Sequence, residues 1–151
     1  MKKLILGVFC VLVLSVGPAF PHCQIPCGIY DDEARFRMME EDILTVEKSM
    51  NEINRLTKEN DKDYNQIVRW VNNKEHHADK ISETATYYFM AQRVAPVDIG
   101  KEREYRAYMD KLSPLHELVF YSMKAKQTVD LSYVDKMRAA LEKFRAVYSN
   151  K

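Results

Sequence analysis

The chain has 151 residues, with 23 Lys and Arg against 22 Asp and Glu. That length is sufficient for one domain of ordinary size. Because basic and acidic residues are interspersed and nearly balanced, the composition argues against nucleic acid as a partner, and it provides no polybasic patch for a membrane surface.

The first 21 residues differ in kind from the rest of the chain. Lys2 and Lys3 precede an almost unbroken apolar run over residues 4–16, and residues 17–19 are Gly, Pro and Ala. This order is typical of a secretory signal peptide, and the apolar run is too short for a comfortable membrane span. We therefore expect residues 1–21 to be removed as a signal and pro-segment. The mature protein would be exported to the periplasm or the extracellular space, with no membrane attachment. An uncleaved N-terminus that tethers the chain to a membrane is the alternative.

Signal cleavage alone would not make His22 the first residue of the mature chain. Signal peptidase rules fit a cut after Ala19, which would leave Phe20 and Pro21 ahead of His22. We therefore predict a second step by a processing peptidase. Removal of the whole segment takes away two lysines and no acidic residue, so the formal charge changes from +1 to −1.

Residues 22–30, His-Cys-Gln-Ile-Pro-Cys-Gly-Ile-Tyr, bring several metal donors together in a short stretch. If His22 is the chain end, its amine, the Cys23 backbone nitrogen and the Cys23 thiolate form two fused five-membered chelate rings. Cys27 can supply a fourth donor after a tight turn at Pro26. Two nitrogens and two sulfurs in one plane suit nickel(II) or copper(II), whereas zinc prefers a tetrahedron. The His22 imidazole remains free to approach axially.

Such a donor set has a redox consequence. Thiolate and amidate donors push electron density onto the metal and favour its higher oxidation state, which suits one-electron chemistry on a small diffusible substrate. A disulfide between Cys23 and Cys27 is the alternative for an exported protein, but it does not explain the adjacent His22. Haem attachment is excluded because the cysteines are four positions apart with no His after the second.

From Asp31 onward, apolar positions recur at helical spacing in four sets. The sets are Phe36, Met39, Ile43, Val46, Met50 and Ile53; Ile67, Val71, Ala78, Ile81, Ala85 and Tyr88; Tyr105, Tyr108, Leu112, Leu115 and Val119; and Val134, Met137, Leu141, Phe144 and Tyr148. Residues 96–100 contain Pro and Gly and break the pattern, Pro114 predicts a kink or restart, and Ser132 is a predicted N-cap. These features predict an all-α fold, an up-and-down four-helix bundle over residues 31–151 with a metal-binding hook at its N-terminus.

Two further groups of side chains have ambiguous roles. The aromatic residues are numerous for a small bundle and can leave part of its apolar surface exposed, so we expect self-association. His76 and His77 beside Glu75 are interpreted as a helical surface pair, with a second metal site as the alternative.

Residues 22–30 resemble the His-Cys-x-x-Pro-Cys-Gly-x-Tyr hook of nickel superoxide dismutases, with all six fixed residue types in place. Residues 69–78 and 114–119 also resemble that family. The resemblance implies an enzyme that converts superoxide to dioxygen and hydrogen peroxide by Ni(III)/Ni(II) cycling. It further implies a homohexamer of four-helix bundles with one nickel ion per subunit. A secreted nickel or copper carrier, with the same hook but no turnover, is the alternative.

The resemblance implies a role for each residue of the hook. His22 would give its amine and imidazole, Cys23 its amide nitrogen and thiolate, and Cys27 its thiolate. Tyr30 matches the tyrosine that lies over the open face and helps to order water and the substrate anion. Gly28 matches the position where the backbone passes close to the metal.

The supporting residues of the family are less well matched. A family tyrosine from the second helix corresponds to Tyr88, with Tyr87 as the alternative. The family also holds the axial imidazole through a Glu and an Arg. The Glu position falls here on Arg37 or Met38, neither of which accepts from an imidazole N–H, and the Arg position corresponds to His77.

Another acceptor must therefore orient the His22 imidazole. The candidates are Glu40, Glu41, a backbone carbonyl or a neighbouring subunit. Because such partners tune the position and basicity of a ligand, the potential and rate of this protein can differ from those of its relatives.

Overall fold

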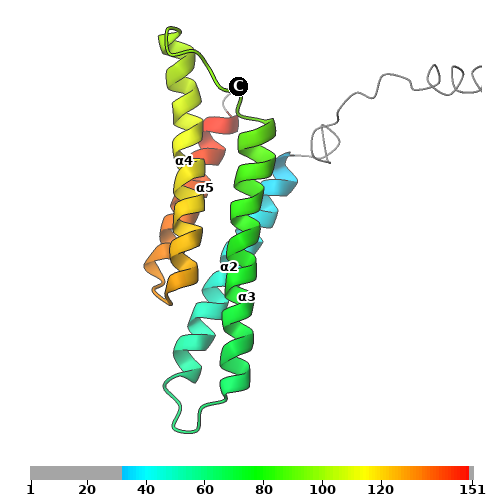
Figure 1. The fold of residues 1–151 in the computed structure, drawn as a ribbon, viewed down its shortest axis with the longest axis vertical. Coiled ribbons are helices and arrows are strands. Elements are labelled where there is room, and N and C mark those ends of the chain that lie inside the picture. The colour runs from blue at the N-terminus through cyan, green and yellow to red at the C-terminus, as the bar shows by residue number, and fades with distance from the viewer. Residues whose placement is uncertain (1–31, 150–151) are drawn as a thin grey trace, which may run out of the picture.

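The computed structural model describes residues 32–149, and helices make up nearly all of this part of the chain (Figure 1). The elements are α2 (Asp32–Leu56), α3 (Tyr64–Glu83), the π-helix η1 (Thr84–Met90), α4 (Glu102–Gln127) and α5 (Ser132–Ser149). Residues 1–31, which include the predicted signal and hook, lie outside the described residues, as do residues 150–151.

The helices follow one another up and down the bundle (Figure 1). Each packs against the helix that precedes or follows it in the chain, and α5 closes the bundle against α2. The packing is most extensive within the pairs α2/α3 and α4/α5. This arrangement confirms the prediction of an all-α up-and-down bundle.

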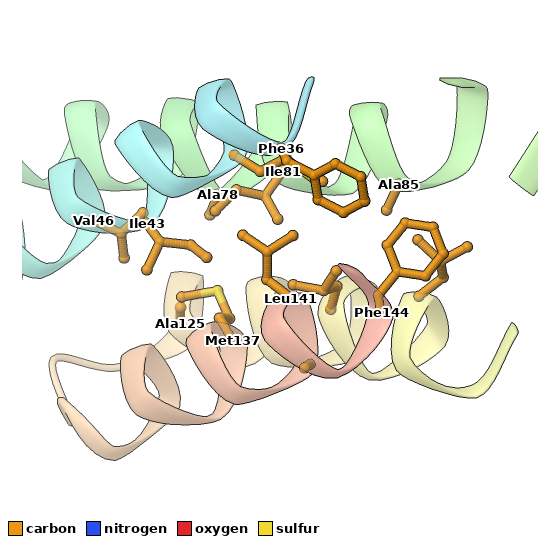
Figure 2. Packing of buried hydrophobic residues seen from close by; sticks show 14 of the residues in the cluster. Phe36, Ile43, Val46, Ala78, Ile81, Ala85, Ala125, Met137, Leu141 and Phe144 are labelled. Carbon is orange, nitrogen blue, oxygen red and sulfur yellow. The ribbon is translucent and has the colours of Figure 1, made fainter. Parts of the chain in front are cut away.

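A single apolar core runs along the bundle axis, with side chains from all four helices facing one another (Figure 2). All six positions predicted for the first helix are buried, with exposed fractions of 5% or less. Phe36, Phe89 and Phe144 fill one end of the core, with ring centroids 4.8–5.5 Å apart. Burial of side chains this large contributes on the order of 2 kcal/mol each to stability.

Three local expectations are corrected by the structure. The third helix does not restart at Pro114, because α4 is continuous through this buried proline, and the alternative of a kink there stays a prediction. On the buried face of α4, Leu118 is fully buried, whereas the expected Val119 is only partly buried. Ser132 is the first residue of α5 rather than its N-cap, and its amide donates to the Asp130 carboxylate at 2.9 Å.

The start of α2 lies at the same end of the bundle as the end of α5 and the segment that follows η1 (Figure 1). This is the end from which the chain leads back to residues 22–30. Within residues 32–149, no helix is both long enough and apolar enough to cross a membrane.

Candidate functional site

The described part of the candidate site is the end of the bundle where the predicted hook joins it. His22, Cys23, Cys27, Gly28 and Tyr30 themselves lie outside the described residues, so their roles stay predictions. Asp32, the first residue of α2, is only two positions beyond Tyr30. Asp32 and its surroundings are therefore the described residues that follow most closely on the predicted hook in the sequence.

Three side chains from distant parts of the chain converge on the Asp32 carboxylate. The Tyr88 hydroxyl donates to Oδ1 at 2.5 Å, and the Tyr148 hydroxyl donates to Oδ2 at 2.7 Å. Arg93 donates through Nε to Oδ1 at 3.1 Å and through Nη2 to the Tyr88 hydroxyl at 3.1 Å. Asp32, Tyr88 and Arg93 thus form a closed triangle, and Tyr148 adds a separate contact from α5.

This arrangement sets the charge state of the cluster. Burial raises the pKa of Asp32, but the hydrogen bonds from Tyr88, Tyr148 and Arg93 together outweigh burial, so the net pKa lies below its usual value. Burial, followed by the hydrogen bond to Asp32, raises the pKa of both tyrosines. Asp32 is therefore an anion near neutral pH, and both tyrosines keep their protons and act as donors.

The π-helix explains how two consecutive residues, Tyr88 and Phe89, are both buried. A regular α-helix from Ile81 would bury Ala85 and Tyr88 in turn. In the wider turn of η1, by contrast, both Tyr88 and Phe89 are buried. The Ala91 amide bonds the Thr86 carbonyl five positions back, as a π-turn requires. π-turns are rare and occur frequently at functional sites.

The same turn separates the two tyrosines that the sequence left as alternatives. Tyr88 is 5% exposed and bonds Asp32, whereas Tyr87 is 57% exposed. We therefore keep Tyr88 as the candidate supporting residue.

His77 has a partner of its own further down the bundle. Its Nδ1 lies 2.6 Å from Oδ1 of the buried Asp42. Asp42 is ten positions along α2 from Asp32, roughly 15 Å along the helix axis. The pair lines a shallow groove between α2 and α3, together with Met38 and Glu41. The structure thus assigns His77 a structural contact, and its predicted role toward the His22 imidazole stays a prediction.

Of the two carboxylates among the acceptors suggested for that imidazole, one already has a partner. Glu40 receives a hydrogen bond of 2.5 Å from Nη1 of Arg145, which also pairs with Glu33. Glu41 is exposed at the edge of the groove. Glu41 is thus the more accessible of the two carboxylates.

The sequence did not indicate the roles of Asp32 and Arg93, and it assigned Tyr148 only to the core. An aspartate at the start of a helix is ordinarily interpreted as a favourable charge at the helix N-terminus. The sequence shows a carboxylate two positions after Tyr30 and a tyrosine near the end of the last helix, but nothing in it indicates that the two meet.

The metal donors predicted from the sequence all precede the described residues. No group of three or more His, Cys, Asp and Glu side chains within residues 32–149 could hold a metal ion. All three cysteines of the chain, at positions 10, 23 and 27, precede α2. The chemistry of His22, Cys23 and Cys27 fits nickel, since amine, amide and thiolate donors suit a planar d⁸ ion.

In the sequence, the two cysteines of the predicted hook come shortly before the first helix of this bundle, an order that fits a metal-dependent redox protein. The family model of nickel-containing superoxide dismutase matches residues 18–151, and the chain belongs to that family. No curated protein and no solved structure matches the chain. The protein is therefore a nickel superoxide dismutase, an oxidoreductase that acts on superoxide and uses nickel as its cofactor.

Proposed function

We propose that residues 22–30 form the catalytic centre and that His22 must be the first residue of the active chain. His22 would bind one nickel ion per subunit through its amine and imidazole, Cys23 through its amide nitrogen and thiolate, and Cys27 through its thiolate. When bound, nickel supplies one-electron chemistry by alternating between Ni(III) and Ni(II). Over one cycle, two superoxide anions and two protons give one dioxygen and one hydrogen peroxide.

The observation that supports this assignment best is the six-residue match of the hook within a chain of this family. The thiolates favour the higher oxidation state, as the chemistry requires. Tyr30 would organise water and the approaching anion over the open face, and Gly28 would let the backbone pass close to the metal. A carrier has no need to organise an approaching anion, so Tyr30 favours the enzyme over a nickel or copper carrier.

The test uses protein that begins at His22 and is loaded with nickel. We expect it to accelerate superoxide decay, and we expect Cys23→Ser and Cys27→Ser to lose both nickel and activity. Tyr30→Phe should retain nickel but turn over more slowly. Wild-type protein that holds nickel without accelerating superoxide decay would support the carrier and refute the enzymatic role of this hook.

We also propose that the protein is exported and processed in two steps, the second by a peptidase that removes Phe20 and Pro21. The order of charged, apolar and small residues in positions 1–19 supports export. Fractionation of expressing cells should recover the mature chain in the periplasm or medium. Recovery of only full-length chain in the cytosol would contradict export.

The active form is proposed to be a homohexamer. Several large apolar side chains on the described surface support self-association, among them Leu44 (56% exposed), Val68 (56%) and Phe120 (43%). Native mass spectrometry of the mature protein should give six times the subunit mass, and a monomer would contradict the proposal.

A further inference from the structure

Asp32 occupies the joint between the bundle and the segment that carries the metal donors. It comes two positions after Tyr30 and five positions after Cys27. At no more than 3.6 Å per residue, the Tyr30 Cα lies within about 7 Å of the Asp32 Cα and the Cys27 Cα within about 18 Å. The position of Asp32 therefore limits where Tyr30 and Cys27 can lie relative to the bundle.

The Asp32 carboxylate accepts more side-chain hydrogen bonds than the start of a helix requires. A first-turn aspartate ordinarily bonds free backbone amides of its own helix. Here the carboxylate instead receives three side chains, Tyr88 from η1, Arg93 from the segment after it and Tyr148 from α5. Hydrogen bonds to a charged acceptor are roughly twice as strong as neutral ones.

The partners of Asp32 are themselves fixed in place. Tyr88 is 5% exposed, and its ring lies edge-on to Phe89 with centroids 5.0 Å apart. The guanidinium of Arg93 lies 5.0 Å from the centre of the Tyr88 ring. The Tyr148 ring packs 5.3 Å from Phe144. Each of the three donors to Asp32 thus packs against an aromatic ring.

We propose that Asp32 is a positioning residue for the nickel chemistry: it fixes the point where the chain leaves the bundle toward the hook, and it orients the Tyr88 hydroxyl at that point. The proposal rests on the function proposed above, in which residues 22–30 hold nickel. Asp32 need not touch nickel or superoxide. It acts by setting where Tyr30 and the thiolates stand relative to the bundle.

Asp32→Asn tests the proposal because it keeps the shape of the side chain and removes its charge. In nickel-loaded protein that begins at His22, we expect the thiolate-to-nickel absorption bands to shift. We also expect kcat to fall about tenfold, because small displacements of reacting groups are costly. KM should change by less than about twofold, since the substrate anion still reaches the site. In metal-free protein, the backbone amides of the first turn of α2 should exchange hydrogen faster.

Two control variants separate positioning from loss of stability. Asp79→Asn makes the same chemical change at an exposed carboxylate, which pairs with Lys126 at 2.7 Å, and should leave the absorption bands unchanged. Lys74→Met should destabilise the bundle, also without shifting the bands. Lys74 is 14 positions from Tyr88 along the second helical segment, about 21 Å along the axis.

Tyr148→Phe keeps the proposal testable if Asp32→Asn fails to fold. It removes one hydroxyl donor and retains the ring, and we expect a smaller shift of the bands in the same direction. If the variants at Asp32 and Tyr148 lose stability but keep wild-type bands and kcat, Asp32 is only structural and the proposal is overturned. Wild-type protein that binds no nickel would instead refute the proposed function, and with it the basis of this inference.

Discussion

The Tyr148 hydroxyl donates a hydrogen bond of 2.7 Å to Oδ2 of Asp32, which joins the last turn of α5 to the first residue of α2 across 116 positions of the sequence. The bond closes the bundle at the end where the N-terminal segment enters. Because the partner is a carboxylate, this single hydroxyl has a larger effect than a neutral hydrogen bond. The first residue of α2 and the last turn of α5 therefore stabilise each other.

Tyr148→Phe should lower the free energy of unfolding of the metal-free protein by about 1–2 kcal/mol, because one donor to a charged acceptor is lost. The ring keeps its contacts with Phe36, Phe89 and Phe144, so no cavity forms. Urea titration measures the change. A variant as stable as wild type would show that the hydroxyl bond contributes nothing in solution.

The stability contributed by Asp32 should depend on pH. Burial raises its pKa, but the three side-chain donors outweigh burial, so the folded-state pKa lies below the ordinary 3.8. Since the folded-state pKa is the lower one, the stabilisation is present above about pH 4 and is lost as the pH falls through the folded-state value. Asp32→Asn should therefore be less stable than wild type at pH 7, and the difference should shrink below pH 4. A difference that stays constant down to pH 2 would contradict this linkage.

Lys74 closes the C-terminal end of α4 from inside the bundle. Its Nζ donates to the carbonyls of Ala125, Lys126 and Thr128 at 2.7, 2.7 and 3.0 Å, and the side chain is 3% exposed. Lys74→Met leaves these buried acceptors without that donor and should cost about 1–3 kcal/mol. Lys126→Met removes a neighbouring lysine that makes a partly exposed ion pair with Asp79, and should cost less than about 1 kcal/mol. Equal losses in the two variants would argue against this role for Lys74.

Phe89 is the side chain that the π-turn brings into the core. Phe89→Ala should lower stability by about 3–5 kcal/mol, because a fully buried ring is replaced by a cavity. The matched variant Tyr87→Ala removes an exposed ring from the same turn and should change stability by about 0.5 kcal/mol. Thermal unfolding of the two proteins gives the comparison, and similar melting temperatures would contradict the assignment of Phe89 to the core.

The fold was largely predictable from the sequence because helical periodicity is a local signal. Phe36 through Ile53 repeats at helical spacing, and every predicted position on that stripe is buried. The π-turn was not predictable, since the spacing of Ile81, Ala85 and Tyr88 fits a regular α-helix equally well. Tertiary packing selects the wider turn, because it lets Phe89 join the core while Tyr88 reaches Asp32.

The candidate site was likewise predictable from the sequence only in part. The hook is a contiguous motif, so its donors can be identified from nine adjacent residues. The Asp32 cluster draws on positions 32, 88, 93 and 148, which only the folded bundle brings together. No spacing along the chain indicates that a tyrosine of the last helix and a carboxylate of the first will meet.

The central claim is that the catalytic centre exists only when His22 is the chain end. It is tested most directly with two nickel-loaded proteins that differ only in whether Phe20-Pro21 precedes His22, with intact mass confirming each N-terminus. We expect the protein that begins at His22 to bind one nickel ion per subunit and dismutate superoxide, and the protein that begins at Phe20 to bind nickel poorly and show no activity. Equal activity in the longer protein would contradict the account, because its terminal amine is not that of His22.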